Sequence, residues 1–433
     1  MKKISARERL EQAFARIDDV KGEGARACLT IYRASAKVAA DASDARMRDG
    51  KSLGSLDGAI VSIKDLFDVA GEVTRAGSRV LADEGKPAAK DAPVVQRLRA
   101  AGAVIAAKTN MTEFAFSGVG ANPHYGTPGN PADRARTPGG SSSGAAVAAA
   151  DGMCEIAIGT DTGGSTRIPA ALCGIVGWKP SKSRISTEGA FPLSNTLDSI
   201  GSMARFVQDC ADADAVMAGE KPRPIEPAAL SGLRIGIAQG MVLENLDETA
   251  AKRFPEALAR LEKAGARLTP EKLELLDGMA GVNAKGGIPP AEALAVHRDR
   301  LDRRSSDIDP NVAARINRAR KISDADYADM IRERAQLVRA MDARLAEFDV
   351  LVMPTTPIVA PKIAEVATAE TFAPRNALLL RNTSIINFFD LCAMSIPMPR
   401  HGGLPTGLML IARNGQDHRL FAIAAAVERL FAA

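Results

Sequence analysis

The chain is poor in aromatic residues and histidine, and it has no long apolar run. Aromatics make up 4% of the 433 residues, so aliphatic side chains must fill most of the core. Only four histidines occur, which leaves few candidates for the commonest catalytic base. No stretch approaches the roughly 18 apolar residues of a membrane helix, and no apolar segment follows the N-terminal lysines. We therefore expect neither a membrane anchor nor a signal peptide.

Cysteine and net charge exclude further classes of protein. The five cysteines are scattered and contain no C-x-x-C pair, so neither a zinc site nor a disulfide framework is expected, and a cytoplasmic location fits best. The net charge is only +4 and the basic residues are spread out, which argues against direct binding of nucleic acid. The densest basic cluster, 298–304, is interleaved with acids, as in a solvated helix.

Short apolar runs alternate along the chain with amphipathic or Ala-rich stretches. This alternation predicts an α/β layered fold, because buried strands read as apolar runs and covering helices as amphipathic ones. A Pro-rich connector between Met217 and Leu233 is the most plausible seam in the chain. We expect strands at 59–63, 103–107, 154–158, 233–238 and 350–353, and helices within 6–48 and at 93–101, 143–151, 247–264 and 322–348.

Two Gly-Gly-Ser clusters, 139–141 and 163–165, are the strongest chemical feature. Glycine allows the backbone to approach a reacting group closely. An Ala-rich helix and an apolar strand are expected between the clusters, so the two turns could face one another across one pocket. A serine nucleophile then needs a base and donors for the oxyanion. The clusters therefore predict a hydrolase built on serines.

The base for such a serine is either a histidine or a lysine. His297 lies on a charged helix and His418 among polar residues, so we expect both to be solvated. Lys64 ends an apolar strand and could act as a base if burial keeps it neutral. On spacing alone, a simple ion pair of Lys64 with Asp65 or Asp68 is an equally good interpretation.

Residues 140–144 also match the G-x-S-x-G turn in which Ser142 would be the nucleophile. That turn should follow a buried strand, yet the preceding residues 130–138 are polar and contain two prolines. This alternative is therefore disfavoured.

Three blocks decide between these alternatives. The blocks are GAIVSIKDLFDVAG (58–71), TPGGSSSGAAVAAA (137–150) and GTDTGGSTRIPAALCGIVGWKP (159–180). In their order and separations they resemble the amidase signature family. A looser likeness continues through 350–361, 381–397 and 403–413, so the resemblance covers most of the chain.

The resemblance implies a single large α/β domain over residues 1–433, with a mixed central sheet covered by helices on both sides. The signature core would span about 58–205. The segment of about 271–322 lacks family character, and it is expected to shape the substrate site. Trp178 stands where the family often has a smaller residue, and we expect it to pack in the core.

The resemblance also implies a Ser–cis-Ser–Lys triad. Ser165 would be the nucleophile, Ser141 a relay serine after a cis peptide bond, and Lys64 the terminal base. A proton would pass from Ser165 through Ser141 to neutral Lys64, and then to the leaving amine. These groups supply every role, so no metal or organic cofactor is expected.

Further residues would support this triad. The backbone N–H groups expected to form the oxyanion hole are those of Thr162, Gly163, Gly164 and Ser165. Asp161 and Arg167 would hold the nucleophile loop, and Ser142 would assist by hydrogen bonding.

The expected reaction is hydrolysis of a small-molecule carboxamide to a carboxylate and ammonia through an acyl-enzyme. The family also contains ureide hydrolases of the biuret or allophanate type, and a glutamine-hydrolysing subunit of a tRNA-dependent amidotransferase. Both alternatives stay open, although the chain lacks the extra C-terminal domain that allophanate hydrolases often carry. A non-catalytic scaffold is disfavoured because all three triad residues are present. A homodimer or a small accessory subunit would fit the family.

Overall fold

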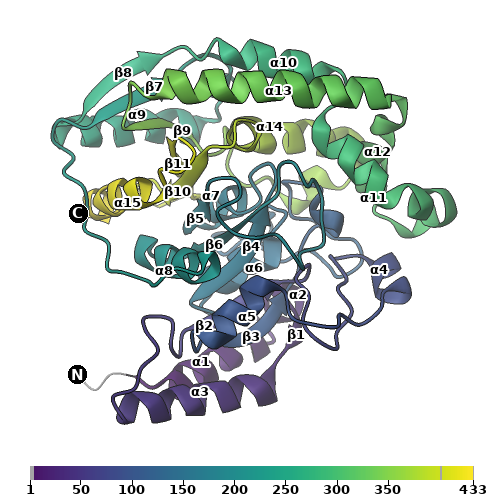
Figure 1. Cartoon of the computed structure of the whole chain (residues 1–433), viewed down its shortest axis with the longest axis vertical. Helices are drawn as coiled ribbons and strands as arrows, with labels where there is room; N and C mark the ends of the chain where they lie inside the picture. The colour runs from purple at the N-terminus through teal and green to yellow at the C-terminus, as the bar shows by residue number, and fades with distance from the viewer. Residues whose placement is uncertain (1–3, 400–401, 433) are drawn as a thin grey trace.

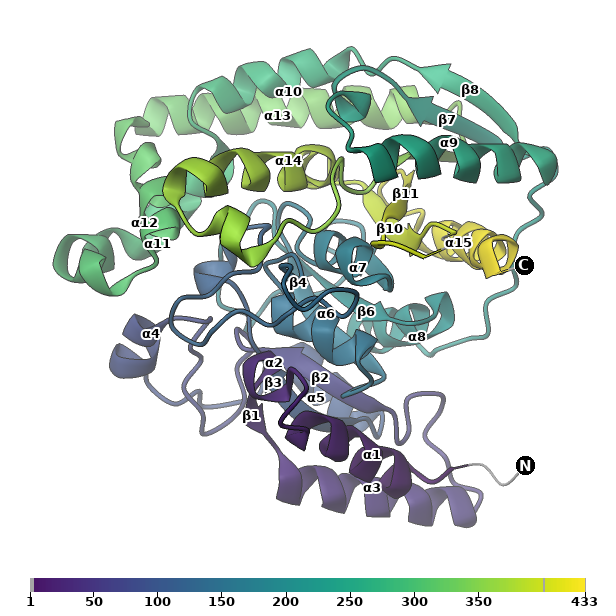
Figure 2. The same ribbon diagram turned by 180° about the vertical axis from the view of Figure 1, so that it is seen from behind.

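The computed structural model describes residues 4–399 and 402–432, and one sheet runs through them. The strand order is β1-β3-β2-β4-β6-β5-β10-β11-β9-β7-β8. Figures 1 and 2 show these strands as one layer that passes from the purple N-terminal part to the green and yellow parts. The strands are β1 (Cys28–Ile31), β2 (Ile60–Lys64), β3 (Val104–Thr109), β4 (Ile156–Asp161), β5 (Val176–Lys179), β6 (Ser199–Ala204), β7 (Arg234–Ala238), β8 (Arg267–Glu271), β9 (Val350–Pro354), β10 (Cys392–Pro397) and β11 (Gly407–Ala412).

Helices cover both faces of this sheet. In the two opposite views, α5 and α8 lie on one face of the sheet, and α6 and α7 on the other (Figures 1 and 2). The helices are α1 (Ala6–Asp18), α2 (Gly24–Ala27), α3 (Arg33–Arg48), α4 (Arg79–Glu84), α5 (Pro93–Ala100), α6 (Ser143–Ala150), α7 (Arg167–Cys173), α8 (Val207–Ala218), α9 (Glu248–Lys263), α10 (Leu275–Ala284), α11 (Ile288–Arg304), α12 (Pro310–Asn317), α13 (Asp324–Leu345), α14 (Ala369–Phe388) and α15 (Asp417–Ala432). Among the described residues, none of these helices is long and apolar enough to cross a membrane.

The sheet is mixed, as the family resemblance implies. Strand β2 pairs in parallel with β3 and β4, and β7 pairs in parallel with β8 and β9, whereas the central pairs from β4 to β9 are antiparallel. The Pro-rich connector joins α8 to β7 without dividing the sheet, so the seam expected there is not a domain boundary. The chain forms one α/β domain.

The burial of two side chains, Trp178 and His297, can be compared with what the sequence predicts. Trp178 is fully buried beside Phe421, and its indole N–H donates to Asp214 at 2.8 Å, so the predicted packing role is confirmed. His297 is also fully buried, with its ring 3.9 Å from that of Phe114, so the expectation of a solvated His297 is wrong. Burial lowers the pKa of His297 to about 3, which keeps the ring neutral.

The parallel pairing of β2 and β4 positions the candidate site. Carboxyl ends of parallel strands lie at the same edge of a sheet, so Lys64 at the end of β2 lies near Asp161 at the end of β4. The chain then turns through 162–166 into α7, and the other Gly-Ser cluster precedes α6. One cluster therefore follows β4 directly, and the other precedes α6, which packs on β4.

Candidate active site

Lys64 is fully buried at the end of β2 and contacts two hydroxyl groups. Its Nζ donates to Ser141 Oγ at 2.8 Å and to Thr160 Oγ1 at 3.0 Å. Burial lowers the pKa of Lys64 to about 7, although the negative charges of Asp198 and Asp161 act in the opposite direction. A large fraction of Lys64 is therefore an uncharged amine near neutral pH. Such an amine can accept a proton.

The ion pair that the sequence left open as an alternative for Lys64 does not form. Asp65 instead pairs with Arg75 at 2.9 Å, and Asp68 accepts a hydrogen bond from the hydroxyl of Thr74. Lys64 is thus left to the serine cluster, where its partners are hydroxyl groups rather than carboxylates.

The first Gly-Ser cluster holds Ser141 in a tightly packed loop. The Gly140–Ser141 peptide bond is cis, as expected, and the Ser141 carbonyl accepts a hydrogen bond from the Thr112 N–H at 3.0 Å. A Cβ atom on Gly140 would lie 2.7 Å from the backbone nitrogen of Gly120. Glycine is required here because two backbone segments meet.

The second cluster forms the turn that carries Ser165. Gly164 has φ +127°, and a Cβ atom there would lie 2.1 Å from Thr383 Oγ1. The same hydroxyl of α14 donates to the Gly163 carbonyl at 2.6 Å and so holds the turn in place. The Ser165 carbonyl accepts from the Ser142 N–H at 3.3 Å. The two clusters therefore lie against one another.

The structure joins only part of the expected triad by hydrogen bonds. Lys64 and Ser141 are in direct contact, but among the described contacts no hydrogen bond links the hydroxyls of Ser141 and Ser165. Ser142 is fully buried, and its hydroxyl donates to the Thr160 carbonyl at 3.4 Å, which fits the supporting role expected for it. No strand precedes Ser142 between β3 and α6, so the context required by the G-x-S-x-G alternative is absent from these described residues.

The expected set of oxyanion donors needs one correction. The Gly164 N–H donates to Asp161 Oδ1 at 2.8 Å, so it is occupied within the turn. The N–H groups of Thr162, Gly163 and Ser165 donate to no other group in the part of the chain that the structure describes. These three donors remain available at the end of β4.

Asp161 organises the turn that carries Ser165. Its fully buried carboxylate accepts from the N–H groups of Gly164 and Thr166, and it forms a two-pronged pair with Arg167. Asn387 of α14 donates to the same carboxylate at 2.9 Å. Burial alone would raise the pKa of Asp161, but the charge and hydrogen bonds of Arg167 outweigh it and hold the pKa well below its usual range.

We expect Asp161→Asn to destabilise the fold by about 3–5 kcal/mol, because it leaves the buried guanidinium of Arg167 without its counter-charge. Urea denaturation measures this loss. The control is Glu188→Gln, which breaks an exposed pair with Lys90 and should leave the unfolding midpoint unchanged. Replacing Arg167 by Met together with Asp161→Asn should recover part of the stability; equal losses in the single and double variants would refute the pairing argument.

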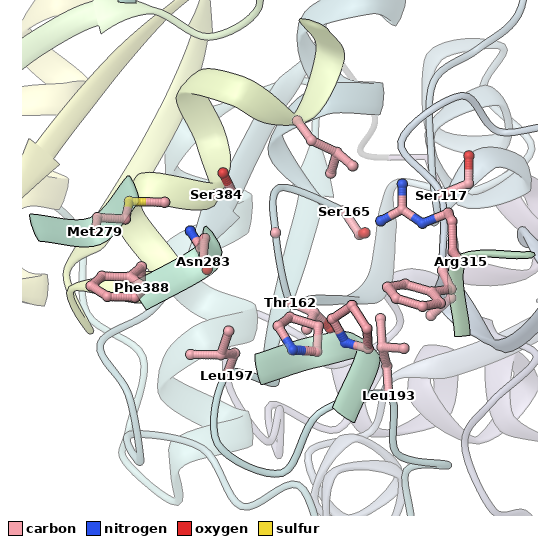
Figure 3. Close-up of a pocket in the computed structure, with 16 residues that line it drawn as sticks. Ser117, Thr162, Ser165, Leu193, Leu197, Met279, Asn283, Arg315, Ser384 and Phe388 are labelled. Atoms are coloured by element: carbon pink, nitrogen blue, oxygen red, sulfur yellow. The ribbon is translucent and has the colours of Figure 1, made fainter. Parts of the chain in front are cut away.

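A cavity of about 220 Å³ opens on the turn that carries Ser165. Of the expected triad, only Ser165 lines this cavity. Lys64 and Ser141 are fully buried and do not line it. Figure 3 shows these lining side chains converging on one space. The lining residues are Ala115, Phe116, Ser117, Thr162, Gly163, Ser165, Leu193, Leu197, Met279, Asn283, Pro289, Pro290, Arg315, Leu380, Ser384 and Phe388.

Three residues of the site were missed by sequence reasoning. Thr160 is a second partner of Lys64, and it falls within a family block, so strand alternation could have placed it beside Lys64. Asn387 reaches Asp161 from 226 residues away. Arg315 lies in the segment without family character, where nothing in the sequence distinguishes it from other surface arginines.

The fold and the contacts at the end of β2 define an α/β protein in which a buried lysine contacts a serine hydroxyl. Comparison with known proteins then gives the family: residues 8–421 match the amidase family model. The chain belongs to the amidase family and is an amidohydrolase that cleaves the C–N bond of a carboxamide.

Two curated relatives and one solved structure support this assignment. The chain is 38% identical to 2-amino-5-chloromuconic acid deaminase of Comamonas testosteroni, over 92% of this chain and 87% of that protein. It is 36% identical to one subunit of the Glutamyl-tRNA(Gln) amidotransferase of Anaeromyxobacter sp. (strain K), over 99% of this chain and 93% of that protein. A crystal structure of an amidase superposes with a TM-score of 0.86 at 31% identity, over 98% of this chain and 96% of that one.

Proposed function

We propose that Ser165 is the nucleophile of the amidase reaction, with Lys64 as the base and Ser141 as the relay between them. One observation carries the proposal: a buried lysine with a pKa near 7 lies 2.8 Å from Ser141, directly behind the turn that presents Ser165 to a cavity. The Ser141–Ser165 hydrogen bond would form when substrate binds, since catalytic contacts are often long in free enzymes.

In the first half-reaction, the Ser165 hydroxyl oxygen attacks the amide carbonyl carbon. Its proton passes to Ser141, whose own proton passes to neutral Lys64. The tetrahedral intermediate collapses as the C–N bond breaks, and the nitrogen receives a proton by the reverse route. Ammonia leaves and an acyl ester on Ser165 remains. Water then repeats the attack and releases the carboxylate and Ser165.

The N–H groups of Thr162, Gly163 and Ser165 are the proposed oxyanion donors. Each lacks a partner among the described residues, and each belongs to the turn that presents the nucleophile. Removing one such donor typically lowers the rate by about 10²–10³. Gly164 shapes the turn, because its positive φ and its contact with Thr383 leave no room for a side chain.

We further propose that residues 271–322 set substrate choice. Five lining residues come from this segment: Met279, Asn283, Pro289, Pro290 and Arg315. The catalytic turn belongs instead to the signature core of about 58–205. The cavity is small, so a small-molecule amide suits it better than a large substrate. Ureides are the rival substrates of similar size.

A cytoplasmic location is proposed on the state of the cysteines. All five are free and buried. Burial raises the pKa of the Cys154 thiol to about 12, which keeps it unreactive. Thiols of this kind are typical of proteins in a reducing compartment.

The test of the nucleophile is covalent labelling. A fluorophosphonate should add one phosphonyl group per chain, and peptide mass spectrometry should place it on Ser165. The control is a Ser165→Ala variant, which should stay unlabelled while unfolding at the same temperature. A label on Ser142 would overturn the proposal and favour the G-x-S-x-G alternative.

A further inference from the structure

Arg315 is the one ionisable side chain that lines the cavity, counted over the described residues. It lies on α12, within the segment proposed to set substrate choice. The other lining residues are apolar, or carry hydroxyl or amide groups. Figure 3 shows the guanidinium group on the same side of the cavity as the side chains of Ser165 and Ser117. The site therefore combines a nucleophilic hydroxyl with a single positive charge.

No group in the described chain neutralises this charge. The Nε of Arg315 is buried and has no hydrogen-bond partner, and no carboxylate forms an ion pair with the guanidinium. Its recorded contact is with the ring of Phe116, 4.5 Å away. Burial, reinforced by the like charge of Arg318, lowers the pKa of Arg315 to about 10, so the side chain is still a cation at neutral pH.

Arg315 is half-buried and its Nε is shielded from solvent, so the charge loses part of its hydration, and no partner in the described chain replaces what is lost. Structural arginines of this fold are paired: Arg167 with Asp161, and Arg75 with Asp65. Arg315 differs from them in facing a cavity instead of a carboxylate. Its missing partner is therefore best supplied by what enters the cavity.

We propose that Arg315 binds a carboxylate of the substrate, so that the substrate is a small amide that also carries a carboxylate group. The proposal rests on the function proposed above, since it places the scissile amide at Ser165. A guanidinium matches a carboxylate through two parallel N–H···O bonds, which would fix the orientation of the amide as well as bind it. The small cavity requires a short spacer between the two groups.

The positive charge of Arg315 also disfavours substrates with an ammonium group. Over the described residues, no aspartate or glutamate lines the cavity, so a substrate ammonium would meet Arg315 without a compensating acid. Amides of free amino acids, glutamine included, carry such a group. We therefore expect amido acids without an amino group to be better substrates than glutamine.

The test compares ω-amido acids, from malonamate to adipamate, with neutral analogues in which a methyl ketone replaces the carboxylate. The wild-type enzyme should prefer at least one amido acid over its ketone. Arg315→Gln should lower kcat/KM for that acid by roughly 10- to 100-fold and change the ketone by less than about threefold. Arg315→Lys should recover part of the loss. Arg318→Gln, which removes a neighbouring charge outside the cavity, is the matched control and should have no effect.

Binding measured without turnover separates this proposal from the proposed function. Calorimetry of Ser165→Ala with the preferred amido acid should give a Kd that rises roughly 10- to 100-fold when Arg315→Gln is added. Equal losses for acid and ketone, or unchanged affinity, would overturn the carboxylate site and leave the role of Ser165 untouched. Arg315→Gln should unfold at or above the wild-type temperature, because it removes a half-buried charge that has no counter-charge; a lower temperature would contradict the proposal too.

Discussion

Ser165→Ala is expected to lower kcat/KM for amide hydrolysis by about 10⁶-fold, the scale on which loss of a catalytic serine acts in other hydrolases. Ser165 is the one member of the proposed triad that reaches the cavity, so the Ser141 hydroxyl cannot replace it without moving the turn. The turn itself is fixed by Asp161 and Thr383, and these contacts do not involve the Ser165 hydroxyl. The variant should therefore fold normally and bind substrate without cleaving it.

The measurement is release of ammonia from a panel of aliphatic amides, aromatic amides, ureides and glutamine. Ser142→Ala is the discriminating control, because Ser142 is buried beside Thr160 and does not line the cavity. Ser142→Ala should lower the rate of ammonia release far less than Ser165→Ala does. Wild-type turnover by Ser165→Ala, or a larger loss in Ser142→Ala, would show that the nucleophile has been misassigned.

The sequence alone could predict the α/β class of the fold and five strands of its sheet. The strands β2, β3, β4, β7 and β9 lie where apolar runs predicted them, since a strand buried on both faces is marked by composition alone. The other six strands were missed: no strand was expected at β5, β6, β8, β10 and β11, and β1 lies inside a region expected to be helical. Strand β1 is only four residues long and half-buried at the edge of the sheet, so it lacks that compositional mark.

The sequence predicted some features of the candidate site and missed others. The Gly-Ser clusters indicated two facing turns, and the structure confirms that these turns are in contact. The choice of Lys64 came from the family resemblance, because spacing cannot show whether a lysine is buried. The engagement of the Gly164 N–H by Asp161 depends on the conformation of the turn, which composition does not fix. Arg315 becomes visible only after folding has brought α12 to the cavity.

The second large effect concerns Lys64. We expect Lys64→Met to lower kcat/KM by about 10³–10⁴, near the upper range for removal of a general base. For the wild-type enzyme, kcat/KM should rise about tenfold per pH unit below pH 7 and level off above it, because only the neutral amine accepts the Ser165 proton and the pKa of Lys64 is about 7. The variant should lose this inflection. A lysine with an ordinary pKa would instead give a rate that rises beyond pH 10.

Lys179→Met is the matched control for this pH profile. Lys179 is also fully buried, and burial lowers its pKa to about 8, but its Nζ donates to the carbonyls of Pro180 and Leu391 and it does not line the cavity. This variant should keep the inflection near pH 7. If Lys179→Met removed the inflection and Lys64→Met kept it, the base would have been assigned to the wrong lysine.

Lys64→Met should make the fold more stable although it lowers activity. The unfolded chain protonates Lys64 below about pH 10.5 and the folded chain only below about 7, so between these values unfolding takes up a proton. Wild-type stability therefore gains from Lys64 as pH rises from 7 to 10.5, and the full cost of burying the amine applies below pH 7. Lys64→Met should stabilise the fold by about 3–5 kcal/mol at pH 6, with a smaller gain at pH 9. Urea denaturation at the two pH values measures the difference, and a variant less stable than the wild type at pH 6 would show that Lys64 is a structural residue and not a base kept neutral by burial.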